Sequence, residues 1–192
     1  MTPPTVSVVG STELEDLLPV LVELLRESVN GGASLGFLPP LPHEEARRYW
    51  LSLGPELRGG TRLLFIAWLA DRVAGTAQLA LPSWPTARHR AELNKVMVAT
   101  ALRGHGIGRR LLQAVHDTAW QRNRSLLVLN TRRGDPAEAF YERLGYREAG
   151  VIPGYMIGPE GEACDNVAMY RPLRVEWDAG DAPGVARYEG AR

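Results

Sequence analysis

The chain has 192 residues, of which 45% are hydrophobic and 23% charged, the composition of an ordinary folded protein. Its 22 basic and 22 acidic residues balance, so neither a nucleic acid nor a membrane is expected as a partner. A single cysteine, Cys164, excludes an intrachain disulfide and a zinc site built on thiolates. Because no signal peptide or membrane-length apolar run is recognisable, we expect a cytoplasmic protein.

The predicted elements alternate between strands and helices. Apolar spacing predicts helices over 11–30, over 42–53 and from 107 onward. An irregular loop over 31–42 separates the first helix from the second. A further helix starts at Asp135, with Glu138 at the capping-box position, and stops at Gly145. The predicted strands cover 6–9, 63–68, 73–81, 92–98, 126–129, 146–152 and 167–170.

The resulting order is β-α-α-β-β-β-α-β-α-β-β, which predicts an α/β fold with one mixed sheet. A single domain over 1–173 accounts for all these elements. Residues 174–192 have little periodic apolar content and are expected to be a loosely ordered tail.

The stretch LRGHGIGRRLL, 102–112, joins a predicted strand to a predicted helix. Its glycines stand at 104, 106 and 108, so the third comes one residue too early for the dinucleotide fingerprint G-x-G-x-x-G. A P-loop needs Gly-Lys-Ser/Thr, whereas Arg109 and Arg110 stand at the helix start. What remains is R-G-x-G-x-G, in which successive amides and the positive helix end could hold a pyrophosphate.

In its context, this stretch resembles the acyl-CoA motif of the GNAT N-acetyltransferases. VMVATALRGHGIGRRLL matches the strand, the R/Q-x-x-G-x-G/A loop and the helix of that family. LLVLNT resembles the strand that follows, and AEAFYERLGY resembles the family's second signature. The resemblance implies a mainly antiparallel sheet flanked by helices, acetyl-CoA as cofactor, no metal, and direct transfer of the acetyl group to an amine.

A closer resemblance is to the tabtoxin-resistance type of acetyltransferase. It rests on VNGGASLGFLPPL, AELNKVMV and PGYMIGPEG, and it implies a small amino-acid-like toxin or antibiotic as substrate, with a resistance role. Members of that group usually have Asp in the strand that here reads LVLNT, where this chain has Asn130.

The resemblance also assigns site residues. Cofactor contacts fall on the end of a strand, the glycine stretch and two later side chains: Met97, Val98, Arg103, Gly104, His105, Gly106, Ile107, Gly108, Arg109, Asn130 and Tyr141. The strand before the stretch should splay near Met97 and Val98 so that the pantetheine arm can lie beside it. An amide at or next to Val98 would then face the reacting carbonyl.

Three residues are candidates for catalysis. Glu92 shares a strand face with Asn94 and could take a proton from the amine, although a strand-edge ion pair is the alternative. Tyr141 matches the family's proton donor, or else it packs in the core beside Phe140. Asn130 cannot be a base and would orient substrate, water or cofactor.

Within the loop over 31–42, residues 31–37 correspond to the acceptor side of the site in this family. Gly32, Ser34 and Phe37 are therefore expected at the substrate together with Glu92, unless the loop is only a structural connection. The ring of His105 is expected in solvent, and His43, His89 and His116 are expected at the surface or in loops. Cys164 is expected in a loop, without a nucleophilic role.

Three functions remain open at this point. The first is acetylation of a small amine by a monomer or homodimer, and the second is acetylation of a protein or peptide. The third is a non-catalytic acyl-CoA-binding module, which Asn130 in place of Asp would suit.

Overall fold

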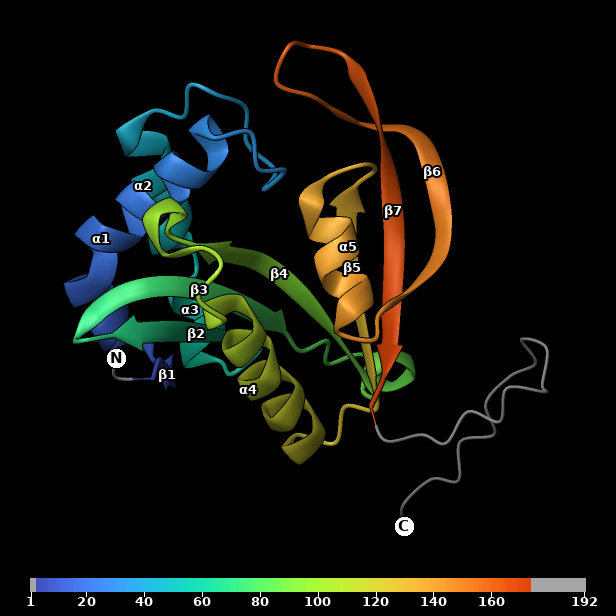
Figure 1. Cartoon of the computed structure of the whole chain (residues 1–192). Coiled ribbons are helices and arrows are strands. Elements are labelled where there is room, and N and C mark those ends of the chain that lie inside the picture. Colours follow the sequence, from blue (N-terminus) through green and yellow to red (C-terminus); the bar gives the residue numbers. More distant parts are fainter. Residues whose placement is uncertain (1–2, 174–192) are drawn as a thin grey trace.

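A computed structural model of the chain describes residues 3–173, so the tail predicted over 174–192 lies outside the described residues. Seven strands form one sheet in the order β1-β2-β3-β4-β5-β7-β6 (Figure 1). The elements are β1 (Thr5–Val9), α1 (Ser11–Asn30), α2 (His43–Ser52), α3 (Gly54–Arg58), β2 (Arg62–Leu69), β3 (Arg72–Ala80), β4 (Arg90–Val98), α4 (Ile107–Gln121), β5 (Leu126–Arg132), α5 (Pro136–Arg143), β6 (Arg147–Ile157) and β7 (Ala163–Pro172).

The predicted fold class is confirmed. β4 and β5 pair in parallel, and the other neighbours in the sheet pair antiparallel. The parallel pair needs a crossover connection, which α4 supplies. The short helix α3 was not predicted, because five residues are too few to carry a helical period.

Helices cover both faces of the sheet, and each face has its own apolar core. α4 and α5 pack on one face over residues such as Phe65, Leu79 and Leu93. α1 and α2 pack on the other face over Leu64 and Ile66. The run RLLFIAWL in β2 is apolar without alternation because the strand is buried from both sides.

A β-bulge in β4 shapes the centre of the sheet. Asn94 pairs with Gln78 and Met97 with Thr76, so two residues of β4 lie opposite one of β3. Lys95, inside the bulge, has a φ of 49°. An extra residue bends its strand, and it moves Met97 onto the α1–α2 face, where it is buried.

β4 and β5 separate early. Their register runs only as far as Glu92, which pairs with Val128, and the two strands then diverge (Figure 1). The splay that was expected near Met97 and Val98 therefore begins several residues earlier, at Glu92, and the bulge lies at Lys95.

Two local predictions on the second half of the chain were wrong. β6 extends through Ile157 and includes the PGYMI segment, beyond the strand that was predicted over 146–152. The capping box at α5 does not form. The Asp135 carboxylate binds Arg132 instead, at 2.7 Å, and Glu138 accepts a hydrogen bond from the Gly134 amide at 2.8 Å.

Candidate active site

The glycine stretch forms a row of free amides at the start of α4. Gly104 and Gly106 have φ of 80° and 76°, and a Cβ at either residue would meet no atom within 4 Å. Glycine is therefore needed for the backbone conformation, and the space above it is open. Among the described residues, no acceptor is hydrogen-bonded to the amides of residues 104–109. Such a row at a helix N-terminus fits an anion such as a pyrophosphate.

Two side chains fix the start of this stretch. The Thr100 amide donates to Glu27 Oε1 at 2.8 Å, which ties the loop to the C-terminal half of α1. Hydrogen bonds from Thr100, with a smaller contribution from Arg103, lower the pKa of the Glu27 carboxyl. Arg103 Nε donates to the Val98 carbonyl at 3.2 Å. Sequence reasoning missed Glu27, because nothing in α1 marks it apart from its helical neighbours.

Several predicted cofactor residues can contact a ligand only through the backbone. The side chains of Met97 and Ile107 are buried in the two cores. Gly108 lies against the α5 ring of Phe140, where an added Cβ would come within 3.2 Å. Ala99 donates its amide to the Ala74 carbonyl of β3, so the amide of Val98 points toward the side that β5 has left.

Glu92 and Asn94 face α1 and α2 at the point where β4 and β5 diverge. Their neighbour Leu93 belongs to the opposite core, and successive strand side chains alternate between faces, as predicted for this pair. Glu92 is half-buried, and Asn94 Nδ2 donates to the Glu92 carbonyl at 3.3 Å. The Glu92 carboxylate thus lies on an accessible face beside the splay.

A polar group that sequence reasoning missed surrounds this position. Gln78 Oε1 accepts hydrogen bonds from the Tyr49 hydroxyl at 2.9 Å and from Arg62 at 3.2 Å, and burial raises the pKa of Tyr49 to about 12. Lys95 Nζ donates to the Leu35 carbonyl at 2.5 Å and lies 5.2 Å from the centre of the Tyr49 ring. Burial and then the charge of Arg62 lower the pKa of Lys95.

Tyr141 and Asn130 lie on α5 and β5. Tyr141 is buried, burial raises its pKa, and its hydroxyl has no hydrogen-bond partner among the described residues. Both expectations for Tyr141 thus remain compatible with its place, because a core tyrosine with a free hydroxyl can still donate a proton. Asn130 is exposed, and its Oδ1 accepts a bond at 2.8 Å from Asn166 Nδ2, which leaves the Asn130 Nδ2 group free.

The predicted acceptor loop reaches across the splay. The Gly32 carbonyl accepts from Arg132 of β5 at 2.9 Å, and Ser34 Oγ lies 3.2 Å from Met156 Sδ of β6. Phe37 packs edge-on against Tyr49. Figure 1 shows this loop and the β6–β7 hairpin rising on either side of the diverging strands.

The histidines and the cysteine complete the predicted residues. His105 is exposed and its Nδ1 lies 2.9 Å from the Arg103 carbonyl oxygen, and His43 is exposed at the start of α2. The surface location predicted for His116 is wrong, since this ring is 6% exposed on the inner side of α4. Its place four residues after the core residue Leu112 could have indicated burial. Cys164 lies in β7, not in a loop.

This arrangement is that of an α/β protein with free amides at a helix N-terminus, beside a parallel strand pair that has opened. Residues 60–148 match the family of GNAT acetyltransferase domains. An uncharacterised N-acetyltransferase of Azospirillum brasilense, encoded in the hisH–hisA intergenic region, is 32% identical over 136 residues, which are 69% of this chain and 77% of that protein. The chain belongs to the GNAT acetyltransferase family and is an N-acetyltransferase.

Two solved structures add to this comparison. A ribosomal-protein-alanine N-acetyltransferase from Brucella melitensis is 25% identical, with a TM-score of 0.70 over 88% of this chain and 99% of that one. An acetyltransferase of Salmonella typhimurium, in a structure with its cofactor acetyl-CoA, is 18% identical. Its TM-score is 0.70, and the match covers 96% of this chain and 100% of that one. The match to this second structure shows a shared fold, and membership of the GNAT family supports acetyl-CoA as the cofactor. Neither name mentions tabtoxin, and that subtype stays a prediction.

Among the described residues, no helix has the length and apolarity that crossing a bilayer requires.

Proposed function

We propose that the protein transfers an acetyl group from acetyl-CoA directly to the amine of a small amino-acid-like molecule, as a toxin- or antibiotic-resistance enzyme would. The observation that carries the proposal is the closure of the 31–42 loop over the diverging strands. Bonds from Arg132 to Gly32 and from Ser34 to Met156 join the two sides of the splay and narrow the acceptor end. An acceptor end narrowed by these two contacts favours a small molecule over a folded protein surface.

The free amides of residues 104–109 would hold the pyrophosphate of the cofactor, and the Val98 amide would lie beside the thioester carbonyl. The bound cofactor supplies an activated acetyl group. An amide aimed at a carbonyl oxygen stabilises negative charge that develops there. The chain would therefore anchor and align the cofactor and polarise its thioester carbonyl. The Val98 amide is available for this because the splay leaves it without a strand partner on the side of β5.

Glu92 is proposed as the group that removes the proton from the amine, directly or through a water molecule. It lies where β4 and β5 part, next to the space that the acceptor would occupy. A base must come within hydrogen-bond reach of the amine or of one bridging water. Asn130, with its free Nδ2, would orient the acceptor or the pantetheine amides.

Tyr141 is proposed to return a proton to the leaving thiolate. Its raised pKa keeps the hydroxyl protonated over the working pH range, and no described residue competes for that proton. Donation is therefore the role that its burial permits.

The charges near Glu92 suggest the acceptor's chemistry. Lys95 places positive charge on the same side as the Glu92 carboxylate, whereas the charge of Arg62 is already paired with Glu56 at 2.9 Å. A zwitterion carries an amine and a carboxylate that could match both signs, whereas a polyamine carries only positive charge. This supports an amino-acid-like acceptor.

The test is an acceptor screen at saturating acetyl-CoA that detects released thiol. It compares amino acids, dipeptides, polyamines and aminoglycosides with peptides that carry a free N-terminal alanine. We expect turnover with amino acids or their analogues. Turnover confined to the long peptides would support a protein acceptor, a second candidate that the Brucella relative's name favours. Binding of acetyl-CoA without thiol release across the whole panel would favour a non-catalytic module.

A further inference from the structure

A small cavity lies on the outer side of the cofactor anchor, between α4, the end of α5 and β7. Its volume is about 200 Å³, and it is lined by Arg109, Gln113, His116, Arg143, Leu144 and Arg171. Three of these six residues are arginines, and none is an acid. A cavity with this lining concentrates positive potential.

The three arginines of the cavity carry no compensating charge. Within the part of the chain that the structure describes, none of them makes an ion pair with a carboxylate. Arg109 and Arg143 are exposed at the rim, while Arg171 is half-buried at the floor. Unpaired guanidinium groups around one hollow are the donors that bind a phosphate group through several N–H bonds.

The floor of the cavity is held in place by buried groups. Arg171 Nη1 donates to His116 Nδ1, and His116 Nε2 lies 3.1 Å from the Tyr146 hydroxyl. Because Nδ1 accepts from a guanidinium, this histidine is neutral, and burial followed by the charge of Arg171 lowers its pKa to about 3. The histidine therefore orients Arg171 without adding a charge of its own.

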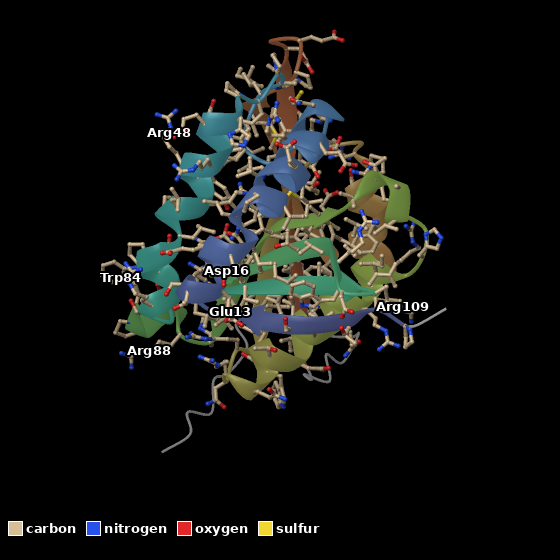
Figure 2. All side chains as sticks on the ribbon, turned by 90° about the vertical axis from the view of Figure 1, so that its left-hand side faces the viewer. Glu13, Asp16, Arg48, Trp84, Arg88 and Arg109 are labelled. Carbon is tan, nitrogen blue, oxygen red and sulfur yellow. The ribbon has the colours of Figure 1, made fainter. Side chains whose placement is uncertain are left out.

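The cavity's position relates it to the anchor. Arg109 belongs both to the row of free amides and to the cavity lining. Gln113 follows one helical turn later, about 6 Å along α4. Figure 2 shows Arg109 at the outer margin of the molecule, on the side opposite Trp84 and Arg88. A nucleotide whose diphosphate lies on the amides would thus have its sugar end beside the cavity.

We propose that this cavity binds a phosphate monoester, and that its occupant is the 3′-phosphate on the ribose of the coenzyme A donor. The volume suits one phosphate group better than a whole nucleotide, since sites for drug-sized ligands span about 300–1,000 Å³. The inference rests on the proposed binding of coenzyme A at the amides. It is independent of the acceptor and of turnover.

Calorimetric titration with unacylated coenzyme A and with 3′-dephospho-coenzyme A, at fixed ionic strength, tests the inference. The wild type should bind coenzyme A at least about 10-fold more tightly than it binds 3′-dephospho-coenzyme A. One charge-assisted contact supplies an affinity ratio of this size. Arg143→Gln should reduce that ratio to near 1 and leave dephospho-coenzyme A binding unchanged, which also reports that the variant is folded. Arg147→Gln, an exposed arginine outside the cavity, is the matched control and should keep the ratio.

Equal affinities in the wild type, or a ratio that survives Arg143→Gln, would overturn the proposal. Competition with inorganic phosphate separates the two sources of a phosphate group. Phosphate should weaken the binding of coenzyme A more than that of the dephospho form, because the free amides can accept an anion in both cases. If phosphate stabilises the protein additively with coenzyme A, the cavity serves a separate anion and the assignment to the donor is wrong. Failure of the acceptor screen would leave these binding results intact.

Discussion

At the scale of single residues, the proposed chemistry depends on one carboxylate and one phenol, and each can be removed with a conservative change. Glu92→Gln keeps the shape of the side chain and removes its basicity. We expect turnover to fall by about 10²–10⁴-fold, the range for loss of a general base, with little change in coenzyme A affinity. Steady-state kinetics and titration of the same preparation measure both quantities. Unchanged turnover would remove Glu92 as the base.

Tyr141→Phe removes only the hydroxyl from a ring that stays buried. Turnover should fall about 100-fold through loss of the proton donor, while the free energy of unfolding changes little, because that hydroxyl has no partner among the described residues. The neighbouring Tyr146, with its ring centre 5.6 Å away, is the matched control. Tyr146→Phe loses its contact with His116 and should cost about 1 kcal/mol of stability without slowing transfer. If Tyr141→Phe instead lowers the free energy of unfolding and leaves the transfer rate unchanged, Tyr141 is a core residue only.

His116 should make stability depend on pH. Its pKa is lowered in the folded state to about 3, from an ordinary 6.5, so the unfolded chain binds more protons between these values. Stability is therefore fully present above about pH 6.5 and is lost as the pH falls toward 3. The loss at pH 5 should be on the order of 1–2 kcal/mol.

Chemical denaturation at pH 5 and pH 8 checks this pH dependence. His116→Gln retains an acceptor for Arg171 and a donor for Tyr146, and it cannot titrate. The free energy of unfolding should change less between pH 8 and pH 5 in this variant than in the wild type. The two changes should differ by the same amount, about 1–2 kcal/mol. Equal pH dependence in both proteins would contradict a buried, neutral His116.

At the scale of elements, α1 supports the start of the glycine stretch from the opposite face of the sheet. Glu27→Ala removes the acceptor of the Thr100 amide at the start of the glycine stretch. Ordering the loop would then cost part of the binding energy, and the dissociation constant for coenzyme A should rise about 3–10-fold. Turnover at saturating cofactor should stay close to the wild-type value. Glu23→Ala, one turn earlier on the same helix and exposed, is the control, and an equal effect of both changes would refute the role of Glu27.

The sequence was sufficient to predict most elements and insufficient to predict how they meet. Long apolar periods gave α1, α4 and the β2–β3 hairpin, because burial on a face imposes those periods. β6 was predicted too short because it is an edge strand with mostly exposed residues, interrupted by Pro153 and Gly154. The bulge at Lys95 was not predicted, because it depends on how β4 pairs with β3 and not on the preference of a single residue.

The same limit applies to the site. The glycine stretch and Glu92 were found because they lie close together in sequence and match a family pattern. Arg132 and Glu27 were not found, since each acts on a residue about 70 to 100 positions away. Contacts between distant segments follow from tertiary packing, which a local pattern does not encode.

At the scale of the whole molecule, two contacts join the 31–42 loop to β5 and β6 at the proposed acceptor end. The contact with β5 can be broken by a substitution that keeps the positive charge of Arg132. Arg132 binds Asp135 and the Gly32 carbonyl through the same guanidinium group, with its Nη2 atom 2.7 Å and 2.9 Å from the two oxygens. A lysine can keep the ion pair with Asp135, but its single ammonium lacks the planar fork that reaches both partners. Arg132→Lys should therefore release the 31–42 loop from β5.

The released loop should affect the acceptor and not the donor. We expect the acceptor KM to rise about 3–10-fold, in line with loss of one charge-assisted hydrogen bond, and larger amines to become better substrates relative to small ones. The KM for acetyl-CoA should stay unchanged, because the anchor lies on α4. Initial rates with each substrate varied in turn measure both constants, and Arg133→Lys at the exposed neighbouring position is the control. If the donor KM moves together with the acceptor KM, the loop belongs to the cofactor site, and the argument for a small enclosed acceptor fails.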